Sequence, residues 1–393
     1  MRPLLFLLGI LLLLVPEILR VYYIMPFPGS QEDVATDLRQ VDIAYWLHTN
    51  IWWVRLVGLA LIIGPCLHYI RHGNGWKRLA VVVPVALAAT VFYLFNFKFM
   101  ADAMFLPVEQ KAMAPVKLND SNARDLVIAV ERNGDARAYP IELIGYHHQV
   151  LDTIDGEPVM VTYCTVCRTG RAFSPVVNGE PESFRLVGMD HYNAMFEDSR
   201  TKSWWRQATG ECIAGPLKGQ LLAEVPSQQM TLAEWSSAHP NTLVLQPDPS
   251  FLDQYAGLED YDEGTIASSL EGRDTASWQP KSWVVGVVHN GVARAYDWND
   301  LMEMPRYTMA DPSASPEHLT LDTLGGDTIC VIVDDAGGFR VNRCTVQHED
   351  VLNIGDGASQ NQYVRKEAIP AYQEFWHSWR TFHPSTTRYV PKQ

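Results

Sequence analysis

Two cysteines separated by two residues are the part of this sequence best suited to chemistry. Cys164 and Cys167 lie in the segment Thr-Tyr-Cys-Thr-Val-Cys-Arg-Thr-Gly, directly after the apolar stretch 159–163. Thiolates at this spacing can bind one Zn(II) or copper ion together with further ligands. They can also cycle between a dithiol and a disulfide when a thiol pKa is lowered. An inert pair in a turn is the third possibility, and the sequence leaves all three open.

A metal site would need ligands from outside the cysteine pair. No second Cys-x-x-Cys is present, so a site with four thiolates from one chain is not expected. His147 is the first candidate for an imidazole ligand, because it precedes the strand expected near Asp152. The further histidine candidates are His148, His191 and His239. Arg168 and Arg171 follow the pair and are expected to stabilise a thiolate.

Three sequence matches in the same order predict a duplicated soluble region. Residues 127–139 and 284–296 share eight of thirteen positions, and 151–161 match 321–331. A Trp-x-x-x-His-Pro-x-Thr pattern begins at Trp235 and again at Trp379. We therefore expect two degenerate tandem repeats, 101–246 with the cysteine pair and 280–393 without it. The acidic segment 247–279 between them is expected to be an exposed connector.

The strand and turn signals within each repeat predict an α+β fold with mainly antiparallel sheets. Asn133-Gly134 and Asn290-Gly291 each separate two strand-like runs, which is the signature of a two-residue hairpin turn. The matched segments place the cysteine pair at a hairpin tip, where the other repeat has residues 334–338. Helical patterns are short, chiefly 231–239 and 371–383.

A membrane region is expected over residues 1–100. Three apolar stretches, about 4–25, 51–70 and 79–97, each approach the length that spans a bilayer. Arg55 is expected to reach the interface by snorkelling. The basic loop 71–78 should be cytoplasmic, which would put the N-terminus inside and the soluble region outside the cytoplasm, in a multi-pass protein of the cell membrane. The lipid bilayer is thus an expected partner, and the helices could also contact another membrane protein.

The charge distribution excludes other classes of partner. The chain has a net charge of −14, although its first 100 residues carry eight Lys or Arg and only five Asp or Glu. A strongly acidic soluble region argues against nucleic-acid binding, which needs a basic face. No phosphate-binding loop or nucleotide fingerprint is present, so no nucleotide cofactor is indicated.

The remaining cysteines have structural interpretations. Cys330 and Cys344 are placed opposite one another across the hairpin around residue 337, where a disulfide is possible. Cys66 falls in an apolar stretch and Cys212 in a strand-like run, so both are expected in cores.

The soluble region resembles a family known by its number, domain-of-unknown-function family 3179. The residues that carry the resemblance include Ala138-Tyr-Pro140, Tyr146-His147, Leu151-Asp152, Val161-Thr-Tyr-Cys164-x-x-Cys167, Thr201-x-Ser203-Trp204, Gly215-Pro-Leu-x-Gly219 and His239-Pro240-x-Thr242. The resemblance covers about residues 115–390 and leaves the membrane region outside. It implies a shared site around Cys164, Cys167 and His147 and supplies no substrate.

The leading expectation is a membrane-anchored extracytoplasmic protein that binds copper or zinc at Cys164 and Cys167, with His147 as a further ligand. The alternatives are a thiol-disulfide oxidoreductase that uses the same pair and a non-catalytic accessory or assembly subunit of a membrane complex. Whether the protein is an enzyme is left open by the sequence.

Overall fold

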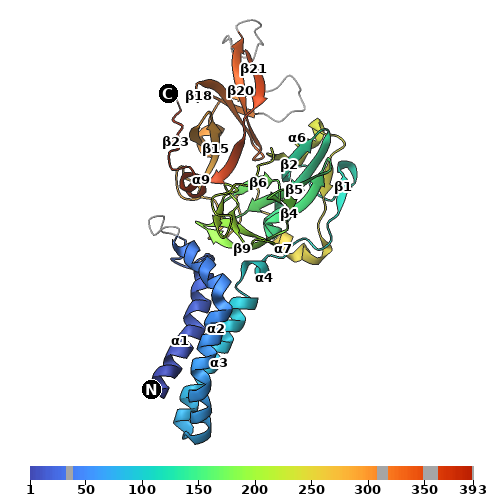
Figure 1. The fold of residues 1–393 in the computed structure, drawn as a ribbon. Helices are drawn as coiled ribbons and strands as arrows, with labels where there is room; N and C mark the ends of the chain where they lie inside the picture. The colour runs from blue at the N-terminus through green and yellow to red at the C-terminus, as the bar shows by residue number, and fades with distance from the viewer. Residues whose placement is uncertain (32–38, 308–316, 348–361, 392–393) are drawn as a thin grey trace. The chain divides into compact units, whose positions relative to one another are not determined.

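Two compact units make up the chain in a computed structural model that describes residues 1–31, 39–307, 317–347 and 362–391 (Figure 1). The first unit comprises Met1–Leu106, Glu182–Arg206 and Glu211–Leu221. The second comprises Pro107–Pro181, Gln207–Gly210 and Leu222–Gln393.

Three long helices dominate the first unit and run side by side in Figure 1. They are α1 (Arg2–Tyr22), α2 (Arg39–His72) and α3 (Gly75–Phe97), followed by the single turn α4 (Ala101–Met104). All three are long and apolar enough to cross a membrane. Large apolar side chains such as Trp53, Ile63 and Val83 are more than half exposed, as a lipid-facing surface requires. The expected membrane association is therefore supported, and α2 begins about one-third of its length before the apolar stretch seen in the sequence.

A polar network joins the three long helices inside this bundle. Glu17 of α1 accepts hydrogen bonds from Arg55 of α2 at 2.5 Å and from Asn96 of α3 at 3.1 Å. Arg20 donates to Glu17 at 3.3 Å and to Asn96 at 2.5 Å. Arg55 is thus paired within the bundle. The expectation that its side chain snorkels to the membrane interface is wrong. Because polar groups in an apolar bundle are costly unless they are paired, this network fixes the register of the three helices.

A four-stranded sheet completes the first unit. Its order is β12 (Cys212–Ala214), β11 (Trp204–Arg206), β10 (Asn193–Asp198) and β9 (Phe184–Asp190). Its buried side chains, including Val187 and Trp204, share one apolar cluster with Ile24 and Ala44 of the helical region. The sequence placed these strands in the first repeat, but apolar packing assigns them to the unit that contains the three long helices.

Two sheets of matching topology form the framework of the second unit. One has the order β1 (Met113–Pro115), β14 (Leu243–Leu245), β3 (Asp135–Pro140), β2 (Leu126–Arg132), β13 (Gln228–Thr231). The other has the order β23 (Thr387–Arg388), β16 (Val292–Asp297), β15 (Trp283–His289), β22 (Ala371–Phe375). The β2–β3 and β15–β16 hairpins turn at the predicted Asn-Gly pairs, whose residues all have the positive φ that this turn requires.

The remaining sheets of this unit are antiparallel. They are β4 (Gln149–Ile154), β5 (Glu157–Cys164), β6 (Thr169–Phe173); β17 (Arg306–Tyr307), β18 (Glu317–Leu324), β19 (Asp327–Asp334), β20 (Phe339–Gln347), β21 (Gln362–Ala368); and the pair β7 (Val176–Val177), β8 (Glu180–Pro181). The mixed, mainly antiparallel fold is thus confirmed. The description as two repeats is corrected, because the strands form a series of small, blade-like sheets that includes the extra sheet β9–β12.

Short helices follow several strands. They are α5 (Ile141–His147), α6 (Leu232–Ala238), α7 (Leu252–Ala256), α8 (Trp298–Met302) and α9 (Trp376–Phe382), with 3-10 turns at Val116–Leu118 and Pro249–Phe251. The helix expected over 371–383 begins only at Trp376, because 371–375 pair with β15 as strand β22. His239 and His383 end α6 and α9, and each lies on a Trp ring with centroids 3.9 Å apart. Both histidines thus pack on tryptophans of their own helices, and His239 is not grouped with the cysteines as a ligand.

The acidic segment 247–279 is not simply exposed. Phe251, Tyr255 and Tyr261 are at most 4% exposed and pack into the apolar cluster of the β2–β3 and β4–β6 sheets. The acidic side chains are carried on a segment that is fixed by these buried aromatic rings.

A disulfide joins Cys330 of β19 to Cys344 of β20, with the Cα atoms 5.9 Å apart. Cys330 pairs across the ladder with Asn342, so the two cysteines are diagonal neighbours and are not directly opposite as expected. Together with Ile332 they form a small apolar cluster.

Candidate functional site

The cysteine pair occupies the tip of the β5–β6 hairpin, as the sequence predicted. Cys164 is the last residue of β5 and pairs with Thr169, the first residue of β6. Arg168 closes the turn with a φ of 54°. Both cysteines are 0% exposed, neither is in a disulfide, and their thiols are hydrogen-bonded to one another. The turn therefore presents two adjacent sulfur atoms in a closed environment.

The β22–α9 segment covers this turn. The Phe375 amide donates to the Cys167 carbonyl at 2.9 Å, and the His377 imidazole donates to the Val166 carbonyl at 3.3 Å. The Ser378 hydroxyl is hydrogen-bonded to the Cys167 thiol and donates to Glu374 at 2.8 Å. Backbone and side-chain contacts together hold the hairpin tip against residues far away in the sequence.

A buried ion pair lies beside the thiols. Arg171 of β6 donates to Glu374 at 2.7 Å, and the two side chains are 3% and 1% exposed. Burial raises the pKa of Glu374, and Arg171 opposes this shift. Burial, the neighbouring Cys164 thiol and the Glu374 charge raise the pKa of Cys167 well above its ordinary value, whereas Ser378 lowers it. A thiolate at Cys167 therefore needs a compensating positive charge.

Lys281 supplies a positive charge at this position. Its ammonium donates to the Leu270 carbonyl and lies 4.8 Å from the ring centre of Phe375. Burial lowers the pKa of Lys281, and the largest opposing effects come from Cys167 and Cys164, ahead of Glu271 and Asp274. The ammonium and the two thiols thus interact electrostatically, and each would stabilise the charged form of the other.

Arg168 and Arg171 do not serve the thiols as expected. Arg168 donates to the carbonyls of Tyr261 and Asp262, both at 3.1 Å, and lies 3.7 Å from the ring centre of Trp283. Arg171 is committed to Glu374. These arginines hold the walls of the site, and Lys281 takes the role that the sequence assigned to them.

His147 lies in another environment. It ends α5, is hydrogen-bonded to the Tyr255 hydroxyl at 2.6 Å, and packs edge-on against Phe251. Over the described ranges, no three His, Cys, Asp or Glu side chains are grouped closely enough to hold a metal ion. The structure therefore brings Cys164 and Cys167 together and does not place His147 with them as a third ligand.

The other histidine candidates are also accounted for. His148 follows α5 with a φ of 62°, and burial lowers its pKa to about 4. His191 lies in the β9–β10 turn of the first unit, where it donates to Asp190 at 2.6 Å. Sequence reasoning missed Lys281, Glu374 and Ser378, because no local motif marks them and only the tertiary fold brings them to the cysteines.

This arrangement can perform two kinds of chemistry. Two adjacent thiolates beside an ammonium can hold one soft ion between their sulfur atoms. The same thiols can lose two protons and two electrons to an external oxidant and form a disulfide.

Comparisons with known proteins identify a family for this chain but no individual relative. No curated protein and no solved structure matches the chain. Residues 106–386 match the family described as protein of unknown function (DUF3179), and the chain therefore belongs to that family.

Proposed function

We propose that this protein binds one Cu(I) ion between the sulfur atoms of Cys164 and Cys167 and handles copper at the outer face of a membrane. The observation that carries the proposal is the pair of adjacent buried free thiols, Cys164 and Cys167, at the hairpin tip, with the half-buried ammonium of Lys281 interacting electrostatically with both. The three long helices serve as the anchor in the bilayer.

The charge balance favours Cu(I) over Zn(II). A Cu(I) ion with two thiolates has a net charge of −1, which the ammonium of Lys281 neutralises. A Zn(II) ion with two thiolates is neutral and would leave the half-buried Lys281 ammonium with only the smaller effects of Glu271 and Asp274, which is less favourable in a low dielectric. Zn(II) also prefers four protein ligands in closed sites, whereas Cu(I) accepts two thiolates.

The proposed location rests on the loops and on the disulfide. Arg71, Lys77 and Arg78 lie at the α2–α3 connection, and such short basic loops are retained in the cytoplasm. Three crossings then put the second unit outside the cytoplasm. The Cys330–Cys344 disulfide agrees with this side of the membrane, because disulfides persist in oxidising compartments.

The test measures Cu(I) bound by the full chain in detergent, loaded without oxygen and titrated against a chromophoric Cu(I) chelator. We expect one copper per chain, which is lost in Cys164→Ser and in Cys167→Ser. Cys212→Ser is the matched control, since Cys212 is a buried thiol in the first unit. Lys281→Gln should weaken binding about tenfold or more, and Lys281→Arg should restore it.

Copper stoichiometry and affinity that are unchanged in both cysteine variants would refute the proposal. Because a cysteine variant could lose copper by misfolding, the Lys281→Gln and Lys281→Arg pair provides a second criterion. Equal Cu(I) affinities for the wild type and for both Lys281 variants would refute the argument that the Lys281 charge favours Cu(I).

Thiol-disulfide exchange is the second candidate function, and the hydrogen bond between the two thiols favours it. A substrate disulfide would accept two electrons and two protons while a Cys164–Cys167 bond forms. The complete burial of both sulfur atoms opposes it, because exchange requires access to the attacking thiol. Alkylation before and after reduction separates the two candidates, since exchange predicts a Cys164–Cys167 disulfide in the protein as isolated.

A further inference from the structure

The buried thiols need a route to the surface. Cys164 and Cys167 are 0% exposed, so no ion reaches their sulfur atoms unless part of the surrounding structure moves. Two stretches of the second unit contact the turn between the cysteines through hydrogen bonds from Thr165 and to Val166. They are the segment 262–280, which precedes β15, and the β22–α9 segment. These two covers differ in how firmly the rest of the unit holds them.

The β22–α9 cover is part of the core. Strand β22 is paired with β15 along its whole length, from Ala371 to Phe375. Phe375, Trp376 and Trp379 are at most 5% exposed. Side chains packed in this way separate only when much of the unit unfolds. This cover is therefore an unsuitable route to the thiols.

The segment 262–280 is held more weakly. It contains no helix or strand, and every one of its residues is exposed or only partly buried. Runs of more than about 12–15 residues without regular structure are uncommon in compact domains, and many of them are lids or binding loops. A segment with few buried apolar contacts also has a small free energy of local opening. The weaker of the two covers is thus the one that can open while the unit stays folded.

Few contacts hold this segment on the cysteine turn. The Thr165 hydroxyl, between the two cysteines, donates to the Glu271 carboxylate at 2.6 Å. The Lys281 ammonium, which interacts with both thiols, donates to the Leu270 carbonyl. The Tyr261 hydroxyl donates to the Thr165 carbonyl at 2.8 Å, and this buried tyrosine fixes the start of the segment. Loss of the Thr165–Glu271 hydrogen bond would free the middle of the segment while its ends stay attached.

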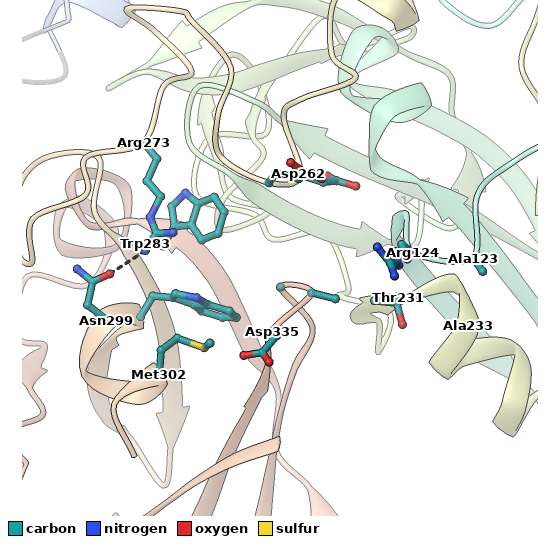
Figure 2. A pocket seen from close by; sticks show the side chains of 14 residues that line it. Ala123, Arg124, Thr231, Ala233, Asp262, Arg273, Trp283, Asn299, Met302 and Asp335 are labelled. Carbon is teal, nitrogen blue, oxygen red and sulfur yellow. Dashed lines mark hydrogen bonds between the residues drawn. The ribbon is translucent and has the colours of Figure 1, made fainter. Parts of the chain in front are cut away.

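The segment also borders free volume. A cavity of about 800 Å³ is lined by Asp262, Glu263 and Arg273 of the segment, and by residues of α8 and of the β19–β20 turn (Figure 2). Arg273 donates to Asn299 of α8 at 2.8 Å, which is the dashed line in Figure 2. Movement beside an open space does not require a packed core to be rearranged.

We propose that residues 265–271 form a gate over the cysteine pair, which opens locally to admit the ion while β22–α9 stays in place. Gly264, which has a φ of 74°, and Gly272 lie at the two ends of the gate and absorb the change in backbone angles. The inference rests on the proposed function only for the identity of what enters, since the opening itself is measured without metal.

The test is the rate at which iodoacetamide alkylates Cys164 and Cys167 in the metal-free full chain in detergent, followed for each cysteine by mass spectrometry. Thr165→Val and Glu271→Ala each remove the charge-assisted hydrogen bond that closes the gate, so each should raise the rate about tenfold or more. The double variant should show at most a small further increase, because both substitutions remove the same bond.

The matched control acts on the other cover. His377→Phe removes one hydrogen bond from the β22–α9 segment to the Val166 carbonyl, and it should leave the alkylation rate unchanged. Urea gives a second criterion, because gate opening exposes little surface. The alkylation rate should therefore rise less steeply with urea concentration than global unfolding does.

Three results would overturn the gate. They are alkylation that requires global unfolding, rates that are unchanged in both Thr165→Val and Glu271→Ala, and a rate in His377→Phe that rises as much as in those variants. If the gate variants behave as expected but no copper binds at the cysteines, the proposed copper function fails and the gate stands.

Discussion

The buried pair between Arg171 and Glu374 allows the sharpest prediction about stability. Arg171 also donates to the Ala208 carbonyl at 3.1 Å and lies on the ring of Tyr372, so its position is fixed from three sides. Replacing Arg171 by Met removes the positive charge and leaves Glu374 buried with hydrogen bonds from neutral hydroxyl groups, those of Ser378 and Thr169.

The magnitude follows from burial. Charges about 4 Å apart attract by about 4 kcal/mol at an effective dielectric of about 20. Removal of one member of a buried pair costs about 3–5 kcal/mol, because the other charge is left without compensation. We expect Arg171→Met to lower the free energy of unfolding by that amount. The double variant Arg171→Met/Glu374→Gln should recover about 2 kcal/mol of the loss, since it removes both charges.

The assay is urea unfolding of the full chain in detergent, followed by the fluorescence of its buried tryptophans. The exposed pair Arg343–Glu367, with side chains 43% and 77% exposed, is the control. Arg343→Met should cost less than about 1 kcal/mol. If the effects of Arg171→Met and Glu374→Gln simply add in the double variant, the two charges are not coupled and the reasoning is refuted.

Three further predictions concern the second unit. Cys344→Ser should destabilise it by about 3 kcal/mol, because the disulfide closes a loop with a sequence separation of 14; unfolding with and without reductant measures this, and equal midpoints would contradict it. Gly286→Ala should cost about 1–3 kcal/mol or more, since a Cβ there would lie 2.2 Å from the Trp379 ring, and it should be partly rescued by Trp379→Leu. Burial raises the pKa of Asp262 to about 6, so its contribution to stability is full below its unfolded pKa of 3.8 and is lost as the pH rises through 6. The melting temperature should therefore change less between pH 5 and pH 7 in Asp262→Asn than in the wild type, and an identical pH dependence would contradict this assignment.

Local features of the fold could be predicted from the sequence. The Asn-Gly turns, the hairpin tip at the cysteines and the apolar helices each depend on signals within a short window. Helix α6 is one example, because its N-cap Thr231 accepts a hydrogen bond from the Glu234 amide within a single turn. Such features are set by neighbouring residues, and the structure reproduces them.

Features that depend on distant contacts could not be predicted in this way. Residues 371–375 have a helical pattern, yet pairing with β15 makes them a strand. The strands β9–β12 lie within residues 101–246, the region that the sequence assigns to the first repeat. Their packing against Ile24 and Ala44 shows that they belong to the unit that contains the long helices. Lys281 and Glu374 reach the cysteines through the same kind of long-range assembly.

The order of these residues along the chain determines how the thiol site matures. Translation proceeds at about 5–20 residues per second, so roughly ten to forty seconds separate the synthesis of Cys167 from that of Ser378. During this interval the nascent chain has the thiol pair but lacks the β22–α9 cover, and for about the first half of it also Lys281, so the sulfur atoms are open to oxidants and to any soft ion. A stalled or truncated product that ends before residue 281 would keep this reactive pair permanently uncovered. Completion of the C-terminal segment is thus the step that converts two reactive cysteines into a protected pair.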